Sequence, residues 1–353
     1  MDRPLELGLD TFGDVTATPD GTLVSHAQAV RDVVEEAVLA DQTGLDFFGV
    51  GEHHRIEFGV SAPEVVLAAI AARTQRIRLG SAVTVLSSDD PVRVYERFAT
   101  LDAISHGRAE VVLGRGSFTE SFPLFGYDLA DYEILFEEKI ELFAELLKDA
   151  PVTWSGTKRA ALQDQWVYPR PENGTLTTWV GVGGSPRSVV RAAHYGLPLM
   201  IAIIGGNPSS FAGHADLHRR ALDQFGQAPQ PIAVHSSGFI AETDEEAIET
   251  LYPHYMAYME KAGKERGWPP ATRAQYLHGV GPEGALYVGS PETVARKIVH
   301  TLRMLGASRF DLRYSNGPMR HDQLMSSIEL YGTKVAPLVR ELMAEADTSS
   351  VQR

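Results

Sequence analysis

The chain has 353 residues, a formal net charge of −14 and no cysteine. The acidic balance argues against a nucleic-acid partner, because phosphate binding needs a basic surface, and the lack of cysteine excludes disulfides, thiolate metal sites and a cysteine nucleophile. No apolar run is long enough to span a membrane, and the first residues lack the features of a signal peptide. We therefore expect a cytoplasmic protein whose partner is a small molecule.

Strand and helix patterns alternate along the whole chain. The expected strands are 5–10, 45–50, 77–86, 108–114, 179–182, 199–204, 232–241 and 309–313, and helices begin near 26, 61, 90, 131, 185, 207, 244 and 321. Eight strand–helix units predict a single α/β domain over residues 1–353, a (β/α)8 TIM barrel. A doubly wound protein of two domains is the competing architecture, but no linker or shift in composition supports a boundary.

Two stretches exceed what such a barrel requires. Residues 150–177 are predicted to form a hairpin or an irregular excursion. Residues 253–287 contain several prolines, glycines and aromatic residues, and we expect them to form a lid over the site. Both are interpreted as insertions into the barrel.

Glu52, His53 and His54 follow directly after an apolar strand. The carboxyl end of a barrel strand is where active sites lie, and histidine suits proton transfer near neutral pH. Histidines bound only to loop carbonyls are the alternative. Neighbouring residues in an extended segment point to opposite sides, so we expect no metal site here. A serine triad is also not expected, because the motif G-x-S-x-G is absent.

A glycine-rich turn between a strand and a helix predicts an anion site. Gly183 and Gly184 let the backbone approach a phosphate, and Ser185 and Ser188 add hydroxyl groups at the start of the helix. The pattern fails the dinucleotide fingerprint, and a tight turn capped by Ser185 is the alternative. Arg115, after the fourth strand, could bind the same phosphate or form a salt bridge inside the barrel mouth.

Three segments together resemble the bacterial luciferase-like family of flavin-dependent monooxygenases: GLDFFGVGEHHRIEFG, RIRLGSAVTVLSSDDPVRVYE and LDAISHGRAEVVLGRGSFTESFPLFG. The resemblance continues through the C-terminal VGSPETVARKIVHTLRMLGASRFDL and covers nearly the whole chain. It implies a barrel enzyme in which reduced FMN reacts with O2 to a C4a-peroxide that oxidises a small organic substrate. A separate NAD(P)H-dependent flavin reductase would supply the reduced FMN.

The resemblance also implies roles for individual residues. His53 matches the catalytic histidine of the family, and the non-prolyl cis peptide under the flavin ring matches Ala82-Val83. The phosphate contacts fall on Arg115, Gly183, Gly184, Ser185 and Ser188. We expect substrate contacts from Phe12, His54, Arg55 and Phe118. Gly114 stands where luciferases have a reactive cysteine, and Gly184 where they have a carboxylate, so light emission from a fatty aldehyde is not implied.

The resemblance leaves two alternative functions open and suggests a homodimer. A deazaflavin-dependent oxidoreductase of the same family would keep the barrel, and a non-catalytic flavin-binding protein would keep the phosphate site without turnover. Family members commonly form homodimers through their second and third helices. The largely apolar segment 65–72 is consistent with that, so a homodimer is expected.

Overall fold

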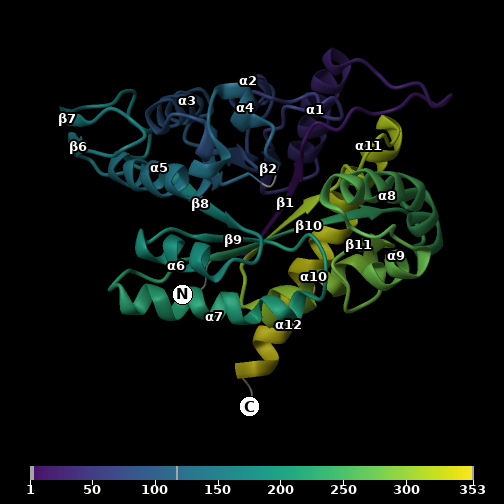
Figure 1. The fold of residues 1–353 in the computed structure, drawn as a ribbon. Coiled ribbons are helices and arrows are strands. Elements are labelled where there is room, and N and C mark those ends of the chain that lie inside the picture. The colour runs from purple at the N-terminus through teal and green to yellow at the C-terminus, as the bar shows by residue number, and fades with distance from the viewer. Residues whose placement is uncertain (1–3, 117, 352–353) are drawn as a thin grey trace.

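The computed structural model describes residues 4–116 and 118–351, and its centre is a closed parallel barrel (Figure 1). Strand β10 pairs with both β9 and β12, and β1 pairs with both β12 and β2, which closes the ring. In ring order the strands are β1 (Glu6–Thr11), β2 (Phe47–Val50), β3 (Arg78–Ser81), β5 (Ala109–Gly114), β8 (Thr177–Val182), β9 (Leu199–Ala202), β10 (Ile232–Ile240) and β12 (Arg309–Arg313). The predicted (β/α)8 barrel is confirmed.

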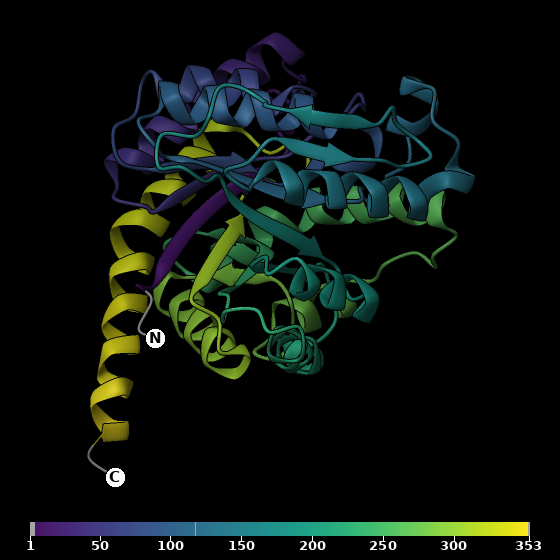
Figure 2. The same ribbon diagram turned by 90° about the vertical axis from the view of Figure 1, so that its left-hand side faces the viewer.

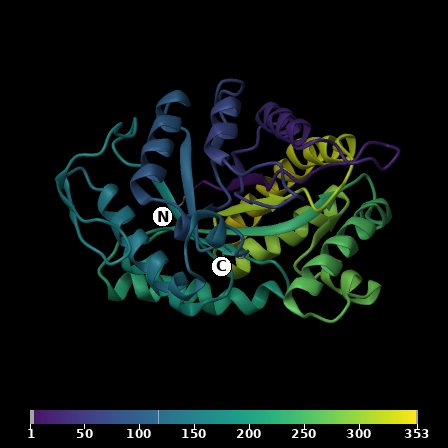
Figure 3. The same cartoon turned by 45° about the horizontal axis from the view of Figure 1, so that its top comes forward.

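Helices surround this ring, as the view in Figure 3 shows. They are α1 (His26–Gln42), α2 (Pro63–Ala71), α3 (Pro91–Ile104), α5 (Tyr132–Leu146), α6 (Pro186–His194), α7 (Ala212–Gln224), α10 (Pro291–Leu305), and the pair α11 (His321–Leu330) and α12 (Ala336–Val351). Their apolar faces pack on the outer faces of the strands and form one large hydrophobic core. None of the described helices is long and apolar enough to cross a membrane.

The helix starts follow from capping residues. In α3 the side chain of Asp90 accepts hydrogen bonds from the backbone N–H groups of Val92 and Arg93, and Pro91 occupies the first turn, where it needs no hydrogen bond. For α2 the sequence predicts a helix that begins near residue 61, but Ser61 does not cap it. The N-cap is Ala62, with no side-chain hydrogen bond, and the nearby Glu64 points to Arg97 instead.

Two expected elements are interrupted. The third strand is split into β3 and the short β4 (Thr84–Val85), and the cis peptide bond between Ala82 and Val83 lies between the two. The last helix contains a π-helical turn, Tyr331–Val335, between α11 and α12. Beyond that turn, α12 runs along one side of the molecule and projects past the barrel (Figure 2).

The two insertions lie on opposite sides of the barrel in Figures 1 and 3. The first contains the antiparallel hairpin of β6 (Val152–Trp154) and β7 (Leu162–Gln165). The predicted start of the second at residue 253 falls inside α8 (Asp244–Arg266), which continues through Pro253. Proline removes only one intrahelical hydrogen bond, and the cap at Thr243 and the buried Leu251 hold the helix together. Helix α9 (Arg273–Val280) and strand β11 (Tyr287–Gly289) complete this insertion.

The face of α2 that does not pack on the barrel is apolar. Val65 is 71% exposed, and Ala69 and Ala72 share its exposed side, whereas Leu67 and Ile70 are fully buried. Half of segment 65–72 is therefore covered within the chain. The homodimer that would cover the remaining stripe stays a prediction.

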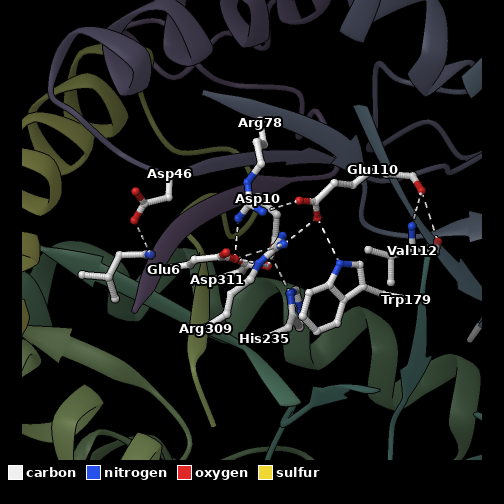
Figure 4. A network of polar contacts seen from close by, with 12 residues as sticks. Glu6, Asp10, Asp46, Arg78, Glu110, Val112, Trp179, His235, Arg309 and Asp311 are labelled. Atoms are coloured by element: carbon white, nitrogen blue, oxygen red, sulfur yellow. Dashed lines mark hydrogen bonds and ion pairs between the residues drawn. The ribbon is translucent and has the colours of Figure 1, made fainter. Parts of the chain in front are cut away.

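A network of charged side chains lies inside the barrel (Figure 4). Arg309 is fully buried and binds Glu110 at 2.7 Å and Asp311 at 2.9 Å, with its guanidinium 3.6 Å from the centre of the Phe47 ring. Glu110 also accepts a hydrogen bond from the indole N–H of Trp179 and pairs with Arg78. These contacts join five barrel strands through side chains alone.

The two carboxylates that bind Arg309, those of Glu110 and Asp311, differ in their acidity. Burial raises the pKa of Glu110, but the two arginines beside it, Arg309 and Arg78, outweigh burial and lower it. Asp311 pairs with Arg309, but burial outweighs this pairing and raises the pKa of Asp311 to about 6. A buried ion pair persists only when each charge keeps its partners.

Replacing Arg309 by methionine should therefore destabilise the protein by about 3–5 kcal/mol, because it leaves Glu110 and Asp311 buried without this partner. Denaturant unfolding followed by circular dichroism measures the loss. Arg296→Met removes an arginine of an exposed pair with Glu292 and should change stability by less than about 1 kcal/mol. Equal stabilities of Arg309→Met and the wild-type protein would contradict this role of Arg309.

Candidate active site

A cavity of about 490 Å³ opens at the carboxyl ends of the barrel strands. Most of the predicted site residues line it together: Phe12, His53, His54, Ala82, Val83, Arg115, Phe118, Gly183, Gly184, Ser185 and Ser188. Arg55 does not line it. Residues from the ends of different strands thus converge on one space, as expected for a parallel barrel.

His53 lies in an aromatic cage within this cavity. Its ring is stacked on Phe58 at 4.5 Å and meets the edges of Phe12 and Phe118 at 4.6 and 5.1 Å. Its Nδ1 atom lies 3.7 Å from a carboxylate oxygen of Glu120. Burial lowers the pKa of His53, and the opposing effect of Glu120 does not reverse this. The imidazole is therefore neutral at neutral pH and able to accept a proton.

Glu52 fixes the histidine segment in place. One carboxylate oxygen binds His54 Nε2 at 2.9 Å, and the other accepts the backbone N–H of Val85 at 2.9 Å. The backbone N–H of Glu52 donates to the carbonyl of Val83 at 3.3 Å. Two links thus connect the segment after β2 to the segment after β3. His54 faces Phe125 rather than the aromatic cage, so the two histidines have different surroundings.

The cis peptide Ala82-Val83 is confirmed and forms one wall of the cavity. Glycines give it room on both sides. A Cβ atom on Gly114 would lie 2.4 Å from a methyl group of Val83, and one on Gly51 would lie 2.8 Å from the carbonyl oxygen of Ala82. Any larger residue at these two positions would displace this wall.

The start of α6 offers donors without partners. The side chain of Ser188 is buried, and its Oγ has no hydrogen-bond partner among the described residues although it lines the cavity. Ser185 occupies the N-cap position, yet its hydroxyl caps no backbone group. Nothing lies within 4 Å of a Cβ built on Gly183 or Gly184. The predicted alternative, a turn capped by the side chain of Ser185, is not what the structure shows.

Arg115 also lines the cavity, but it is paired. Its guanidinium lies 2.5 Å from Glu133 and 5.3 Å from the centre of the Tyr132 ring. Glu133 in turn lies within 4.0 Å of Arg187 and Arg191. The sequence left open a phosphate contact or a salt bridge, and in this structure the salt bridge is formed. A phosphate bound by Arg115 would have to compete with Glu133.

Arg55, for which a substrate contact is expected, lies outside this cavity. The guanidinium binds Glu265 of α8 and also approaches Glu57, and its carbon atom lies 4.7 Å from the centre of the Phe118 ring. It belongs to a neighbouring cavity instead. Arg55 takes this position because the tertiary structure brings Glu265 of α8 to the loop after β2.

The sequence interpretation missed a third histidine in the cavity, beside His53 and His54. His235 Nδ1 lies 2.6 Å from the carboxylate of Asp10, and both residues line the cavity together with Asp311. Burial by itself lowers the pKa of His235, but Asp10 outweighs burial and raises it. A histidine in the middle of the apolar run 232–241 was the available signal. Its partner lies 225 residues away, so no local motif reveals the pair.

Comparisons with known proteins identify the family of the chain. The sequence model of the luciferase-like monooxygenases matches residues 11–309. The 4-hydroxyprotoasukamycin monooxygenase of Streptomyces nodosus subsp. asukaensis is 32% identical over 68% of this chain and 67% of its own.

Two solved structures share the fold at low sequence identity. The FMN-bound oxygenating constituent of 3,6-diketocamphane monooxygenase from Pseudomonas putida has a TM-score of 0.74 and 20% identity, over 95% of this chain and 99% of its own. The coenzyme F420 dependent tetrahydromethanopterin reductase from Methanopyrus kandleri has a TM-score of 0.71 and 19% identity, with the same coverage.

Asp10→Asn should lower the pKa of His235, because the neutral amide no longer stabilises the imidazolium. In the wild-type protein the raised pKa contributes stability that is complete below pH 6.5 and is lost as the pH rises through the higher, folded-state pKa. Titration of the imidazole carbon-bound protons by NMR measures the change. Asp216→Asn, at an exposed site on α7, is the control. An unchanged pKa of His235 in Asp10→Asn would refute the pairing.

Proposed function

Because the chain belongs to the luciferase-like monooxygenase family, we propose that it is a monooxygenase that uses reduced FMN and O2 to oxidise a small organic molecule. The observation that carries this proposal is the unpartnered, buried Oγ of Ser188, which faces the cavity at the start of α6. A buried hydroxyl without a partner costs free energy unless a ligand satisfies it. Its location at a helix N-terminus suits a phosphate.

The donor set fits the phosphate of FMN. Ser185 and Ser188 would donate hydroxyl groups, and the open backbone at Gly183 and Gly184 would let the phosphate come close. Arg115 would supply the charge after exchanging Glu133 for the phosphate. The flavin ring would then be held against Ala82-Val83, in the part of the cavity that His53 also lines. When bound, reduced FMN supplies the oxygen-transfer chemistry with O2.

His53 would act as the proton acceptor or donor of the reaction. Its neutral imidazole can take a proton from a reacting group, and Glu120 at 3.7 Å would stabilise the imidazolium that results. The phenyl rings of Phe12, Phe58 and Phe118 would exclude water from the imidazole of His53. Glu52 would position the histidine segment without taking part in the chemistry.

A deazaflavin-dependent oxidoreductase of the same fold is the second candidate, and the F420-dependent structural neighbour is the observation that favours it. Titrating the purified protein with FMN and with coenzyme F420, and recording the visible spectrum of each bound ligand, separates the two proposals. We expect FMN to bind the tighter of the two. A separate flavin reductase would then be needed for turnover with NAD(P)H.

The phosphate assignment predicts opposite effects of two substitutions. Arg115→Ala should weaken FMN binding by roughly tenfold to a hundredfold, since charge-assisted hydrogen bonds contribute about 1.5–3 kcal/mol. Glu133→Gln should strengthen it, because the competing carboxylate is gone. Fluorescence titration measures both, and riboflavin, which lacks the phosphate, should bind all three proteins alike. If riboflavin binding falls as much as FMN binding in Arg115→Ala, Arg115 supports the structure rather than the phosphate.

His53→Gln should leave FMN binding intact and slow turnover by about 10²–10⁴-fold. The wild-type rate should fall on the acid side, below pH 6.5, where His53 becomes protonated, and this limb should be absent in the variant. Both effects are measured as steady-state rates at a series of pH values, with a flavin reductase and a substrate that the wild-type protein oxidises. His54→Gln should be much less impaired, because His54 lies outside the aromatic cage. Wild-type rates and pH dependence in His53→Gln would show that His53 is structural.

A further inference from the structure

A second cavity of about 330 Å³ lies beside the first and has no role so far. Its walls come from the segments after β1, β2 and β12 and from helix α8. Most of the lining side chains are apolar or aromatic: Val15, Leu23, Ile56, Phe58, Phe118, Ala257, Tyr258, Ala262 and Pro318.

Two phenyl rings lie between this cavity and the candidate active site and form a wall that the two share. Phe118 lines both cavities. Phe58 lines the second cavity and is stacked at 4.5 Å on His53, which lines the first. A molecule that extends past these rings would thus have one end beside His53 and the other in the second cavity.

The charged residues around the second cavity neutralise one another. Arg55 binds Glu265, and Lys261 pairs with Glu57. The fifth, Asp14, pairs with the buried Arg313 at 3.5 Å and accepts hydrogen bonds from the hydroxyl of Ser315 and the backbone N–H of Gly317, at 2.7 and 2.8 Å. A charged ligand would have to break these contacts, which favours an uncharged one.

Large apolar side chains also stand at the outer edge of this cavity. Ile56 is 77% exposed and Leu23 is 60% exposed, and both line it. Side chains of this kind lose contact with water when an apolar ligand covers them, and each buried methylene group contributes favourably. The edge therefore suits the entry of an apolar molecule.

We propose that the second cavity is a substrate subsite for the uncharged, apolar arm of an elongated substrate whose reacting end lies beside His53. The proposal rests on the proposed function for the reacting end. The first cavity must hold the flavin ring and the reacting group together, so a longer substrate needs further space. The adjoining second cavity provides that space.

The probes are straight-chain 2-alkanones of increasing length, and their binding to the FMN-loaded protein is measured by isothermal titration calorimetry. Each buried methylene should tighten binding by about fourfold. In the wild-type protein this trend should continue to longer chains than in Ala257→Trp, which fills the second cavity from α8. Glu260→Trp places the same side chain at an exposed position of α8 outside the cavity and should keep the wild-type trend.

The same limiting chain length in the wild-type protein, Ala257→Trp and a second filling variant, Ala262→Leu, would overturn the proposal. Circular dichroism checks that each variant is folded. If Ala257→Trp does not fold, the chain-length limit of Ala262→Leu decides whether the second cavity is a subsite. Repeating the series without flavin separates this outcome from a failure of the proposed function. A protein that binds no FMN but still shows the shorter limit in Ala257→Trp would keep the subsite and refute the FMN proposal.

Discussion

The ion pairs of Arg309 inside the barrel are the interaction on which the site depends. A single guanidinium binds Glu110 of β5 and Asp311 of β12 and lies over the ring of Phe47 of β2. Its position requires small residues around it, because a Cβ atom on Gly8 would lie 2.3 Å from a carboxylate oxygen of Asp311. This buried layer is the support beneath the cavity, since Phe47 and Asp311 belong to both. The floor of the site is thereby fixed by charges that cannot move apart without large cost.

Two histidines above this floor have opposite acid–base properties for a clear physical reason. His53 is surrounded by three phenyl rings and meets a carboxylate only at 3.7 Å, so burial dominates and lowers its pKa. His235 touches Asp10 at 2.6 Å, so the carboxylate dominates and raises its pKa. One cavity therefore contains two imidazoles whose pKa values are shifted in opposite directions. Such pairs of groups with divergent pKa values are typical of active sites.

The two ends of the site are also chemically distinct. At the start of α6 lie hydroxyl groups, open glycine backbone and Arg115, all suited to a dianion. On the far side of His53 lie the phenyl rings of Phe58 and Phe118 and the apolar second cavity. Helix α8 forms part of that second cavity, and its ion pairs with Arg55 and Glu57 fix it to the loop after β2. An elongated molecule would thus meet polar and apolar ends in a fixed order.

Local patterns in the sequence determined the barrel and half of the site. Alternating strand and helix signals predicted eight units, and the residues just after strand ends, such as His53, Arg115 and Ser185, do meet in one cavity. This worked because the carboxyl ends of parallel strands must lie at one edge of a barrel. The short-range glycine pattern likewise marked the turn before α6.

Only the tertiary structure decided which charges meet. His235 and Asp10 are 225 residues apart, Arg55 and Glu265 are 210 apart, and Arg309 and Glu110 are 199 apart. No local motif encodes such pairs, because their distance depends on the register of several strands and on how α8 folds over the loops. Arg115 shows the same limit, since its sequence position fits a phosphate or a salt bridge equally. The packing of α5 beside it settles that Glu133 is its partner here.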